Sequence, residues 1–240
     1  MASVIVVGAR GRMGTLLCRA FDEADDFELV GGYDAQDVGE LDQEAPTADL
    51  LVDFSSPQAL PHVLAYVDRT GSALLSGTTG LDQDQLASIR ERGERSRVIW
   101  SGNYSLGVAV LRHATRMAVE ALPGWDVEIV ECHHGGKADA PSGTAKMLLA
   151  EVDPEGTADV AYGREGIVGP RPKGQVGMHS LRGGTVAGTH EVHFFGDDEE
   201  VCLTHRATSR QIFVNGAVAA ARRLLGCEPG SYDFDDLMFS

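Results

Sequence analysis

Acids, bases and a helix start fall within one short run of the sequence, Glu131-Cys132-His133-His134-Gly135-Gly136-Lys137-Ala138-Asp139-Ala140-Pro141-Ser142-Gly143-Thr144-Ala145. The two glycines before Lys137 disfavour a helix, so we expect the imidazoles and the ammonium group to converge around a turn. Ser142 or Thr144 can cap the helix that follows, and the backbone N–H groups at that helix start favour an anion. The run therefore predicts proton transfer beside an anionic ligand.

Neither histidine pair in the chain has the pattern of a metal site. His133 and His134 are adjacent, so at an extended strand end their rings face opposite ways and only one easily reaches a given atom. Residues 190–193 read His-Glu-Val-His, and a strand there also turns its two histidines to opposite sides. Because these pairs lack both helical i, i+4 spacing and a nearby cysteine–histidine grid, we predict no metal site.

A strand, a tight glycine turn and a helix open the chain. An apolar run at residues 3–7 is followed by Gly8-Ala9-Arg10-Gly11-Arg12-Met13-Gly14 and then by a helix-forming stretch. Asp34 closes the next expected strand, twenty positions after Gly14. Glycines let the backbone approach a pyrophosphate on the helix N-terminus, and the aspartate can accept hydrogen bonds from a ribose diol. Although the first spacing departs from Gly-x-Gly-x-x-Gly, this context predicts a dinucleotide site formed by residues 8–13 and Asp34.

The residues around Asp34 bear on the choice of cofactor. Asp34 is followed by Ala35 and Gln36, which offer no cation to a 2′-phosphate, so NADH is favoured. Arg10 and Arg12 in the glycine turn can supply such a cation, so NADPH stays open.

Two more polar loops follow expected strands in the same half of the chain. They are Gly77-Thr78-Thr79-Gly80, after residues 73–76, and Ser101-Gly102-Asn103-Tyr104, after residues 98–100. Both fall at the carboxyl ends of parallel strands, where doubly wound sheets bind ligands. We therefore expect residues 77–79 and 101–104 to line a nicotinamide pocket.

Strands alternate with helices over the first hundred residues, and several strands are continuous apolar runs, as in a parallel sheet with both faces covered. After residue 103 the pattern changes. Short glycine-containing turns join three successive strands, which predicts an antiparallel meander over residues 176–182, 185–195 and 200–207. A strong helix follows at 214–225, and beyond it come the charges of an acidic tail, Asp233, Asp235 and Asp236.

The predicted fold class is therefore α/β with two domains. Residues 1–103 form a doubly wound, Rossmann-like dinucleotide-binding domain, which the returning segment 214–240 joins. Residues 104–213 form a smaller α+β domain for substrate binding and oligomerisation.

Composition narrows the possible partners. The chain has 36 acidic and 20 basic side chains and a formal charge of −16, which repels nucleic acid and anionic membranes. An anionic substrate then needs local cations or helix ends to hold it. No apolar run approaches the roughly 20 residues of a membrane span, and the four cysteines form no Cys-x-x-Cys pair, which fits reduced thiols. We expect a soluble, cytoplasmic protein that binds small molecules.

Taken together, these motifs resemble the 4-hydroxy-tetrahydrodipicolinate reductase family, also called dihydrodipicolinate reductases. The run from Glu131 to Ala145 is similar to the hallmark segment of that family. The similarity extends over nearly the whole chain, through Gly8-x-x-Gly11-Arg12-Met13-Gly14, Asp53-Phe54-Ser55, Gly77-Thr78-Thr79-Gly80, Arg164-x-Gly166 and Ser209-Arg210-x-x-Phe213-x-x-Gly216-Ala217. One departure is residues 101–104, where the family pattern has Ala-Pro or Ala-Ala before Asn and Phe in place of Tyr104. It affects only the detail of the nicotinamide pocket.

The resemblance implies a reaction and a role for each site residue. A cyclic dicarboxylic imine, or its hydrated precursor, is reduced by NADH or NADPH to tetrahydrodipicolinate on the diaminopimelate route to lysine. His133 takes the family's acid–base position and Lys137 its proton donor, while His134 and the N–H groups of Gly143 and Thr144 hold the substrate's carboxylates. The family also implies a homotetramer built through the sheet of the second domain.

Some questions stay open at this stage. Arg210 is either a further carboxylate clamp or a structural ion-pair partner. A different dehydrogenase of similar build, acting on aspartate or homoserine, would not account for the block from His133 to Thr144. A non-catalytic NADH-sensing protein would bind the cofactor without oxidising it, and the density of acid–base groups argues against that reading.

Overall fold

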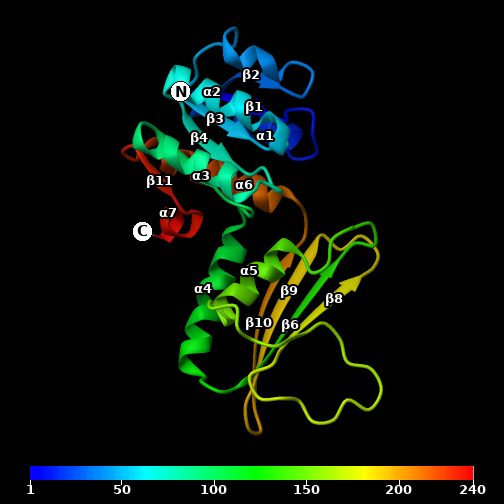
Figure 1. The fold of residues 1–240 in the computed structure, drawn as a ribbon. Helices are drawn as coiled ribbons and strands as arrows, with labels where there is room; N and C mark the ends of the chain where they lie inside the picture. Colours follow the sequence, from blue (N-terminus) through cyan, green and yellow to red (C-terminus); the bar gives the residue numbers. More distant parts are fainter. Residues whose placement is uncertain (240) are drawn as a thin grey trace. The chain divides into compact units, whose positions relative to one another are not determined.

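The computed structural model describes residues 1–239, which divide into two compact units. The first contains residues 1–106 and the chain from residue 211 onward, and the second contains residues 107–210. In Figure 1 the first unit runs from blue to green and ends in orange and red, and the second runs from green through yellow to orange. Each unit has a sheet of its own.

The first unit is built on a six-stranded parallel sheet with the order β11-β5-β4-β3-β1-β2. Its central strands β1, β3 and β4 are almost wholly buried, as continuous apolar strands are when helices cover both faces. The doubly wound class predicted from the sequence is confirmed. The strands are β1 (Ala2–Val7), β2 (Phe27–Tyr33), β3 (Leu50–Asp53), β4 (Ala73–Ser76), β5 (Arg97–Trp100) and β11 (Gly230–Tyr232).

Helices pack on this sheet through apolar stripes. Ile5, Leu51 and Leu74 share one core with α2, while α6 contacts α1 and the strands β4 and β5. The α-helices of this unit are α1 (Gly14–Asp22), α2 (Leu60–Thr70), α3 (Gln83–Glu91), α6 (Gln211–Leu225) and α7 (Phe234–Phe239), with short 3-10 helices at Val38–Asp42, Pro57–Ala59 and Arg92–Glu94. None of the helices within residues 1–239 combines the length and apolar character that a membrane crossing requires.

The acidic tail expected after residue 225 is an ordered part of the fold instead. β11 extends the sheet by pairing in parallel with β5. Phe234 and Leu237 on α7 are buried, and Tyr104 packs edge-on against Phe234. Two buried apolar side chains therefore anchor this segment, and its three aspartates lie at or near the surface.

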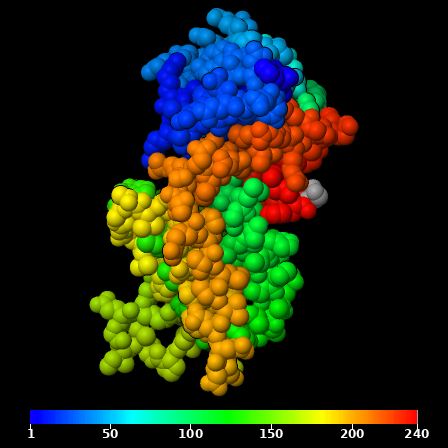
Figure 2. Space-filling view, turned by 180° about the vertical axis from the view of Figure 1, so that it is seen from behind, coloured from blue at the N-terminus to red at the C-terminus, as the bar shows by residue number. Residues whose placement is uncertain are grey.

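The second unit has a five-stranded mixed sheet with the order β10-β9-β6-β8-β7. Leu111 of α4 and Leu148 of α5 pack with Ile129 and Phe194 of the sheet in one core, and Figure 1 shows both helices on the same face. The other face includes the exposed part of β10, which Figure 2 shows in orange at the surface. The elements are α4 (Leu106–Ala121), α5 (Gly143–Val152), β6 (Asp126–His133), β7 (Val160–Ala161), β8 (Val176–Arg182), β9 (Gly188–Phe195) and β10 (Glu200–Ala207).

The predicted meander is wrong for its first strand. β9 and β10 form an antiparallel hairpin, but β6 lies between β9 and β8 and pairs in parallel with β8. The chain between β6 and β8 contains α5, and a crossover of this length is what parallel neighbours require. The short glycine turn after β8 therefore leads across β6 and not to an adjacent strand.

Candidate functional site

The glycine turn after β1 has the close packing that a dinucleotide cradle needs. Gly8 has φ of +82°, and a Cβ on it would collide with the carbonyl of Phe54. A Cβ on Gly14 would collide with the backbone of Gly8, so the start of α1 packs directly on the turn. Glycine at these two positions keeps the turn tight and the helix close to it, and Gly11 between them has no side chain to block the approach of a pyrophosphate to the backbone. The residues present therefore fit a nicotinamide dinucleotide.

Asp34 lies at the position expected of a ribose ligand. Its Oδ2 accepts a hydrogen bond from the Arg10 backbone N–H at 2.9 Å, so the carboxylate faces the glycine turn. A cavity of about 410 Å³ opens beside it, within the range of small-molecule sites. Its lining includes Gly8, Gly11, Asp34, Phe54 and His62.

A second aspartate, which the sequence analysis did not single out, engages Arg10. The Arg10 Nη2 lies 2.8 Å from Asp37 Oδ2, and its Nη1 lies 3.4 Å from Asp34 Oδ2. Asp37 also accepts the Asp34 N–H at 2.5 Å. Hydrogen bonds from this N–H and from Arg10 hold the pKa of Asp37 below its ordinary value. Arg10 is therefore already paired with two carboxylates, whereas Arg12 is exposed.

The two polar loops of the first unit differ in what they offer a ligand. Thr78 is buried, where its Oγ1 accepts the Ser55 N–H at 3.0 Å, while Thr79 is exposed. Ser101 is also nearly buried, and its hydroxyl donates to the Asn103 carbonyl at 2.8 Å. Thr78 and Ser101 thus stabilise their loops. The exposed neighbours, Thr79 in one loop and Gly102 in the other, are the positions open to a ligand.

Tyr104 has a packing role that the sequence analysis did not assign to it. Its ring is 1% exposed and lies between Phe54 and Phe234, with ring centroids 5.6 and 5.2 Å away. Its hydroxyl donates to the Ser76 carbonyl at 2.8 Å. Since its side chain is enclosed in this way, the direct cofactor contact expected of Tyr104 has no support in the structure.

In the second unit, the backbone turns between His134 and Lys137, where the sequence has two glycines. The Lys137 N–H donates to the His134 carbonyl at 3.1 Å, closing the turn. The loop after β8 braces it, because the His134 N–H donates to the Val186 carbonyl at 2.8 Å and the Gly135 N–H to the Gly184 carbonyl at 3.2 Å. The bases are therefore held by backbone contacts from two segments.

Glu131 is the wholly buried centre of this site. Its carboxylate lies 2.6 Å from His133 Nδ1 and accepts two hydrogen bonds from the Arg182 guanidinium at 2.7 and 2.8 Å. It also accepts the Ser142 backbone N–H at 3.1 Å. Burial acts to raise the pKa of Glu131, but the hydrogen bonds from Arg182 and His133 outweigh it and lower the pKa to about 2. A buried carboxylate is therefore ionised at neutral pH and fully paired.

Lys137 has a more exposed partner. Its Nζ lies 2.7 Å from Asp139 Oδ1, and 60% of the Asp139 side chain is accessible. The hydrogen bond from Lys137 lowers the pKa of Asp139. Exposed pairs of this kind contribute little energy, so Lys137 can exchange Asp139 for another anion.

Ser142 makes the helix cap for which the sequence allowed either Ser142 or Thr144. Its Oγ accepts the Ala145 N–H at 3.1 Å, and Thr144 lies inside the first turn of α5. Gly143 and Thr144 are thus the first residues of a helix whose N-terminus favours negative charge. The Ser142 N–H bound to Glu131 joins this helix start to the end of β6.

His190 and Arg182 belong to the site but were not identified from the sequence. His190 is 4% exposed, its Nε2 lies 3.0 Å from Ser142 Oγ, and its ring packs edge-on against His133 at 5.1 Å. Burial, followed by the neighbouring His133, lowers the pKa of His190 to about 4. The alternation of side chains along β9 could have indicated that His190 is buried, because it lies on the same strand face as the buried Val192 and Phe194. Arg182 lies 51 positions from Glu131, and no local pattern links the two.

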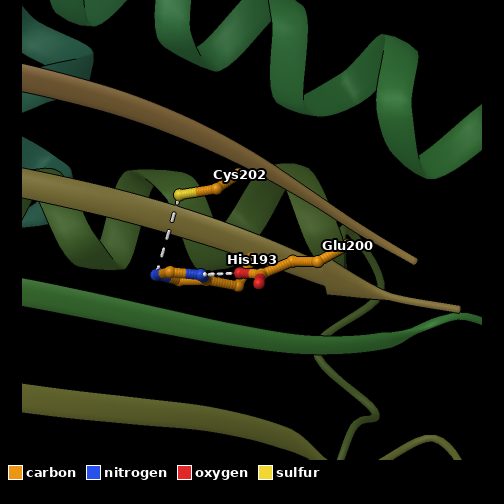
Figure 3. A group of neighbouring side chains, drawn as sticks. All are labelled: His193, Glu200 and Cys202. Carbon is orange, nitrogen blue, oxygen red and sulfur yellow. Dashed lines mark hydrogen bonds and ion pairs between the residues drawn. The ribbon is translucent and has the colours of Figure 1, made fainter. Parts of the chain in front are cut away.

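A second histidine cluster lies elsewhere in this unit, where His193, Glu200 and Cys202 meet across β9 and β10 (Figure 3). His193 Nδ1 is 2.5 Å from Glu200 Oε1, and its Nε2 is 3.5 Å from Glu191 Oε2 and 3.8 Å from Cys202 Sγ. Each ring nitrogen already faces a carboxylate, so contacts among these side chains account for the cluster. His190 and His193 lie on opposite faces of the strand, as expected from the sequence.

Comparison with known proteins covers the whole chain. The family described as dihydrodipicolinate reductase, N-terminus, matches residues 2–104, and dihydrodipicolinate reductase, C-terminus, matches residues 107–238. A 4-hydroxy-tetrahydrodipicolinate reductase from Rubrobacter xylanophilus is 41% identical, over 100% of this chain and 99% of its own length. One from Xanthomonas campestris pv. campestris is 40% identical, over 98% and 97%.

Solved structures share the same fold. A dipicolinate-bound dihydrodipicolinate reductase from Paenisporosarcina sp. TG-14 has a TM-score of 0.77 at 24% identity, over 97% of each chain. GenD2 from gentamicin A biosynthesis, in complex with NAD, has a TM-score of 0.57 at 16% identity, over 98% of this chain and 90% of its own. Family matches to both halves and relatives of full length agree with the acid–base loop and the glycine turn, and the chain belongs to the dihydrodipicolinate reductase family.

Proposed function

We propose that this chain reduces 4-hydroxy-tetrahydrodipicolinate, or dihydrodipicolinate, to tetrahydrodipicolinate with NADH or NADPH, on the diaminopimelate route to lysine. It is an oxidoreductase of the activity for which its full-length relatives are named. The observation that carries the proposal is the buried Glu131, which pairs with His133 at the end of β6 and accepts the Ser142 N–H at the start of α5. Lys137 lies on the loop between these two elements. Reduction of a ring that carries two carboxylates requires a proton source for the ring and a site that binds the carboxylates, such as a helix N-terminus.

The substrate's carboxylates are held by His134 and by the first turn of α5. The N–H groups of Gly143 and Thr144 are placed at the positive end of the helix dipole. Such a site offsets the repulsion that a chain of charge −16 exerts on a dianion. The relative with bound dipicolinate, an aromatic analogue with the same pair of carboxylates, supports this ligand class.

Protons are handled by His133 and Lys137. When bound, the reduced nicotinamide supplies hydride to the substrate ring, and the added electron pair leaves a centre that takes up a proton. Lys137 is the proton donor, and its Nζ pairs with the exposed Asp139. His133 is the acid–base group, and the pairing of its Nδ1 with Glu131 leaves Nε2 for exchange.

The first unit favours NADH over NADPH. Residues 8–13 cradle the pyrophosphate and Asp34 binds the ribose diol, while the exposed parts of 77–79 and 101–103 border the nicotinamide. A 2′-phosphate placed beside Asp34 would also meet Asp37, and Arg10 is already paired with both carboxylates. Arg12 remains the available cation for a 2′-phosphate, so NADPH is the weaker substrate.

The protein acts as a homotetramer in the cytoplasm. Leu181 and Phe195 in the second unit's sheet are 54% and 40% exposed, which supports assembly through this sheet. Four unpaired cysteines fit a reducing compartment. Light scattering of the purified chain tests the assembly, with a tetramer expected and a monomer contradicting it.

The reaction is tested by following oxidation of NADH and of NADPH in the presence of pyruvate, aspartate semialdehyde and the preceding synthase. We expect oxidation that depends on the synthase, and faster with NADH. Aspartate and homoserine, with the oxidised cofactor, form the control for a different dehydrogenase. Turnover with either of them, or none with the synthase product, contradicts the proposal.

A further inference from the structure

Resting on the proposed function, a further inference concerns the two residues behind His133. We propose that Glu131 and Arg182 are positioning residues, which keep the proton of the neutral His133 ring on Nδ1 and so present Nε2 to the substrate. Neither residue contacts the reacting atoms in this scheme. Both act through the imidazole.

The hydrogen-bonding capacity of Glu131 determines which ring nitrogen is protonated. An ionised carboxylate only accepts hydrogen bonds, so at 2.6 Å from its Oε2 the His133 Nδ1 must be the donor. In a neutral ring the other nitrogen, Nε2, then has a lone pair. Arg182 keeps the carboxylate ionised by donating to both of its oxygens, at 2.7 and 2.8 Å. The low pKa of Glu131, about 2, agrees with this geometry.

The two ring nitrogens of His133 have different surroundings. The carboxylate closes the Nδ1 side, and 12% of the His133 side chain is exposed. A Cβ on Gly188 would lie 3.1 Å from His133 Nε2, so a residue without a side chain leaves space there. Arg182 also donates to the Asp139 carbonyl at 2.7 Å, which joins the carboxylate to the loop that bears Lys137.

The variant Glu131→Gln separates charge from shape. Its amide has one acceptor oxygen, for which Arg182, the Ser142 N–H and His133 would compete, and its NH₂ group can only donate. Facing His133, that NH₂ group favours the opposite tautomer, with the proton on Nε2. We expect kcat to fall roughly 10²-fold or more, as on loss of a positioned acid–base group, with the substrate KM changing less than about threefold. Glu131→Asp, which keeps the charge and both acceptors, is expected to recover part of the rate.

Glu128→Gln is the matched control. Glu128 lies on the same strand, and its hydrogen bonds with Arg164, His179 and Arg171 lower its pKa to about 2 against the effect of burial. It lies on the opposite face of β6 from Glu131, because three positions separate them. This variant is expected to leave the His133 tautomer and kcat unchanged. A general loss of stability would affect both variants, whereas a positioning role affects only Glu131→Gln.

The deciding measurement is a long-range ¹⁵N–¹H correlation spectrum of the histidine rings, with His133 assigned by its absence in His133→Gln. The proposal predicts a proton on Nδ1 and a bare Nε2 in the unaltered protein, and the reverse in Glu131→Gln. A proton on Nε2 in the unaltered protein overturns it even if Glu131→Gln does not fold. An unchanged tautomer or an unchanged kcat in a folded Glu131→Gln overturns it as well. Failure of the unaltered protein to oxidise NADH counts against the proposed function, and the spectrum still decides the tautomer.

Discussion

His133 and Lys137 lie on one loop but are held in different ways. His133 is anchored to a buried carboxylate, while Lys137 pairs with an exposed aspartate. A base that must keep one orientation gains from the first arrangement, and a cation that must meet an arriving dianion gains from the second. In the proposed reaction the acid–base group is therefore fixed and the proton donor is movable.

The substitution His133→Ala is expected to lower kcat about 10²–10⁴-fold, the usual contribution of a positioned acid–base group. The fold and cofactor affinity should persist, because the expected cofactor residues lie in the other unit. Steady-state kinetics and NADH calorimetry measure both quantities. Near-normal turnover in this variant would contradict the role of His133.

Lys137→Ala removes the proposed proton donor, which is also the cation proposed to face the substrate. We expect a lower kcat and a higher substrate KM, with NADH affinity little changed. Isothermal titration with NADH in the absence of substrate is the control. A collapse of cofactor affinity there would place Lys137 in the cofactor site instead.

Asp37→Asn tests the account of cofactor choice. The amide oxygen can still accept the Asp34 N–H, but the nearer of the two carboxylate charges that pair with Arg10 is gone, and only Asp34 at 3.4 Å remains. Releasing Arg10 for one charge-assisted hydrogen bond to a 2′-phosphate is expected to raise kcat/KM for NADPH roughly tenfold. The same constant for NADH should change little. No gain with NADPH would show that the Asp37 pair does not set the preference.

At the scale of elements, the start of α5 connects the site to the core of the second unit. Ser142 caps the helix, donates its N–H to Glu131 and places its hydroxyl beside His190. The helix end that is expected to bind a carboxylate is therefore fixed by the same residue that contacts the acid–base network.

Ser142→Ala is expected to lower the free energy of unfolding by about 1–3 kcal/mol, because a helix cap and a buried hydrogen bond are both lost. The substrate KM should rise as the first turn of α5 loosens. Urea unfolding and steady-state kinetics measure the two effects. Ser142→Thr retains the hydroxyl and should keep most of both properties; equal losses in the two variants would mean that the hydroxyl is not responsible.

The elements that could be predicted from the sequence are those with local causes. The β1 strand, the glycine turn and α1 follow one another along the chain, and their apolar and glycine positions show it. The insertion of β6 between β8 and β9 was not predictable, because strand order depends on contacts between distant segments. The site contacts of Arg182 and His190 were not predictable for the same reason, because their partners lie about 50 positions away in the sequence. The loop position of Tyr104 indicated a ligand contact but gave no sign that its side chain packs in the core.

Although the whole chain has an excess of acidic groups, two of its glutamates are stabilised in their ionised form. Glu128 and Glu131 both have a pKa near 2 in the folded protein, against an ordinary value of 4.5. A carboxyl group whose pKa is lower in the folded than in the unfolded protein stabilises the folded state when the pH is above the unfolded-state pKa. This stabilisation is lost as the pH falls toward the folded-state pKa.

Acid should therefore destabilise the protein between about pH 4.5 and pH 2, by on the order of a few kcal/mol for each of these two glutamates. His190 acts in the same direction from a higher pH, since it is neutral when buried and its pKa falls from 6.5 to about 4. Thermal unfolding measured across this range tests the prediction. Glu128→Gln should show a shallower dependence on pH than the unaltered protein, and an identical dependence would contradict it.

The most direct test of the central claim follows hydride into the product. NADH deuterated at the transferable position of the nicotinamide is incubated with the chain and the product of the preceding synthase, and the resulting tetrahydrodipicolinate is analysed by mass spectrometry. With the unaltered protein we expect the product to carry the deuterium, and with His133→Ala we expect product formation to fall about 10²–10⁴-fold. Consumption of NADH without labelled product, or no reaction with this substrate, would contradict it.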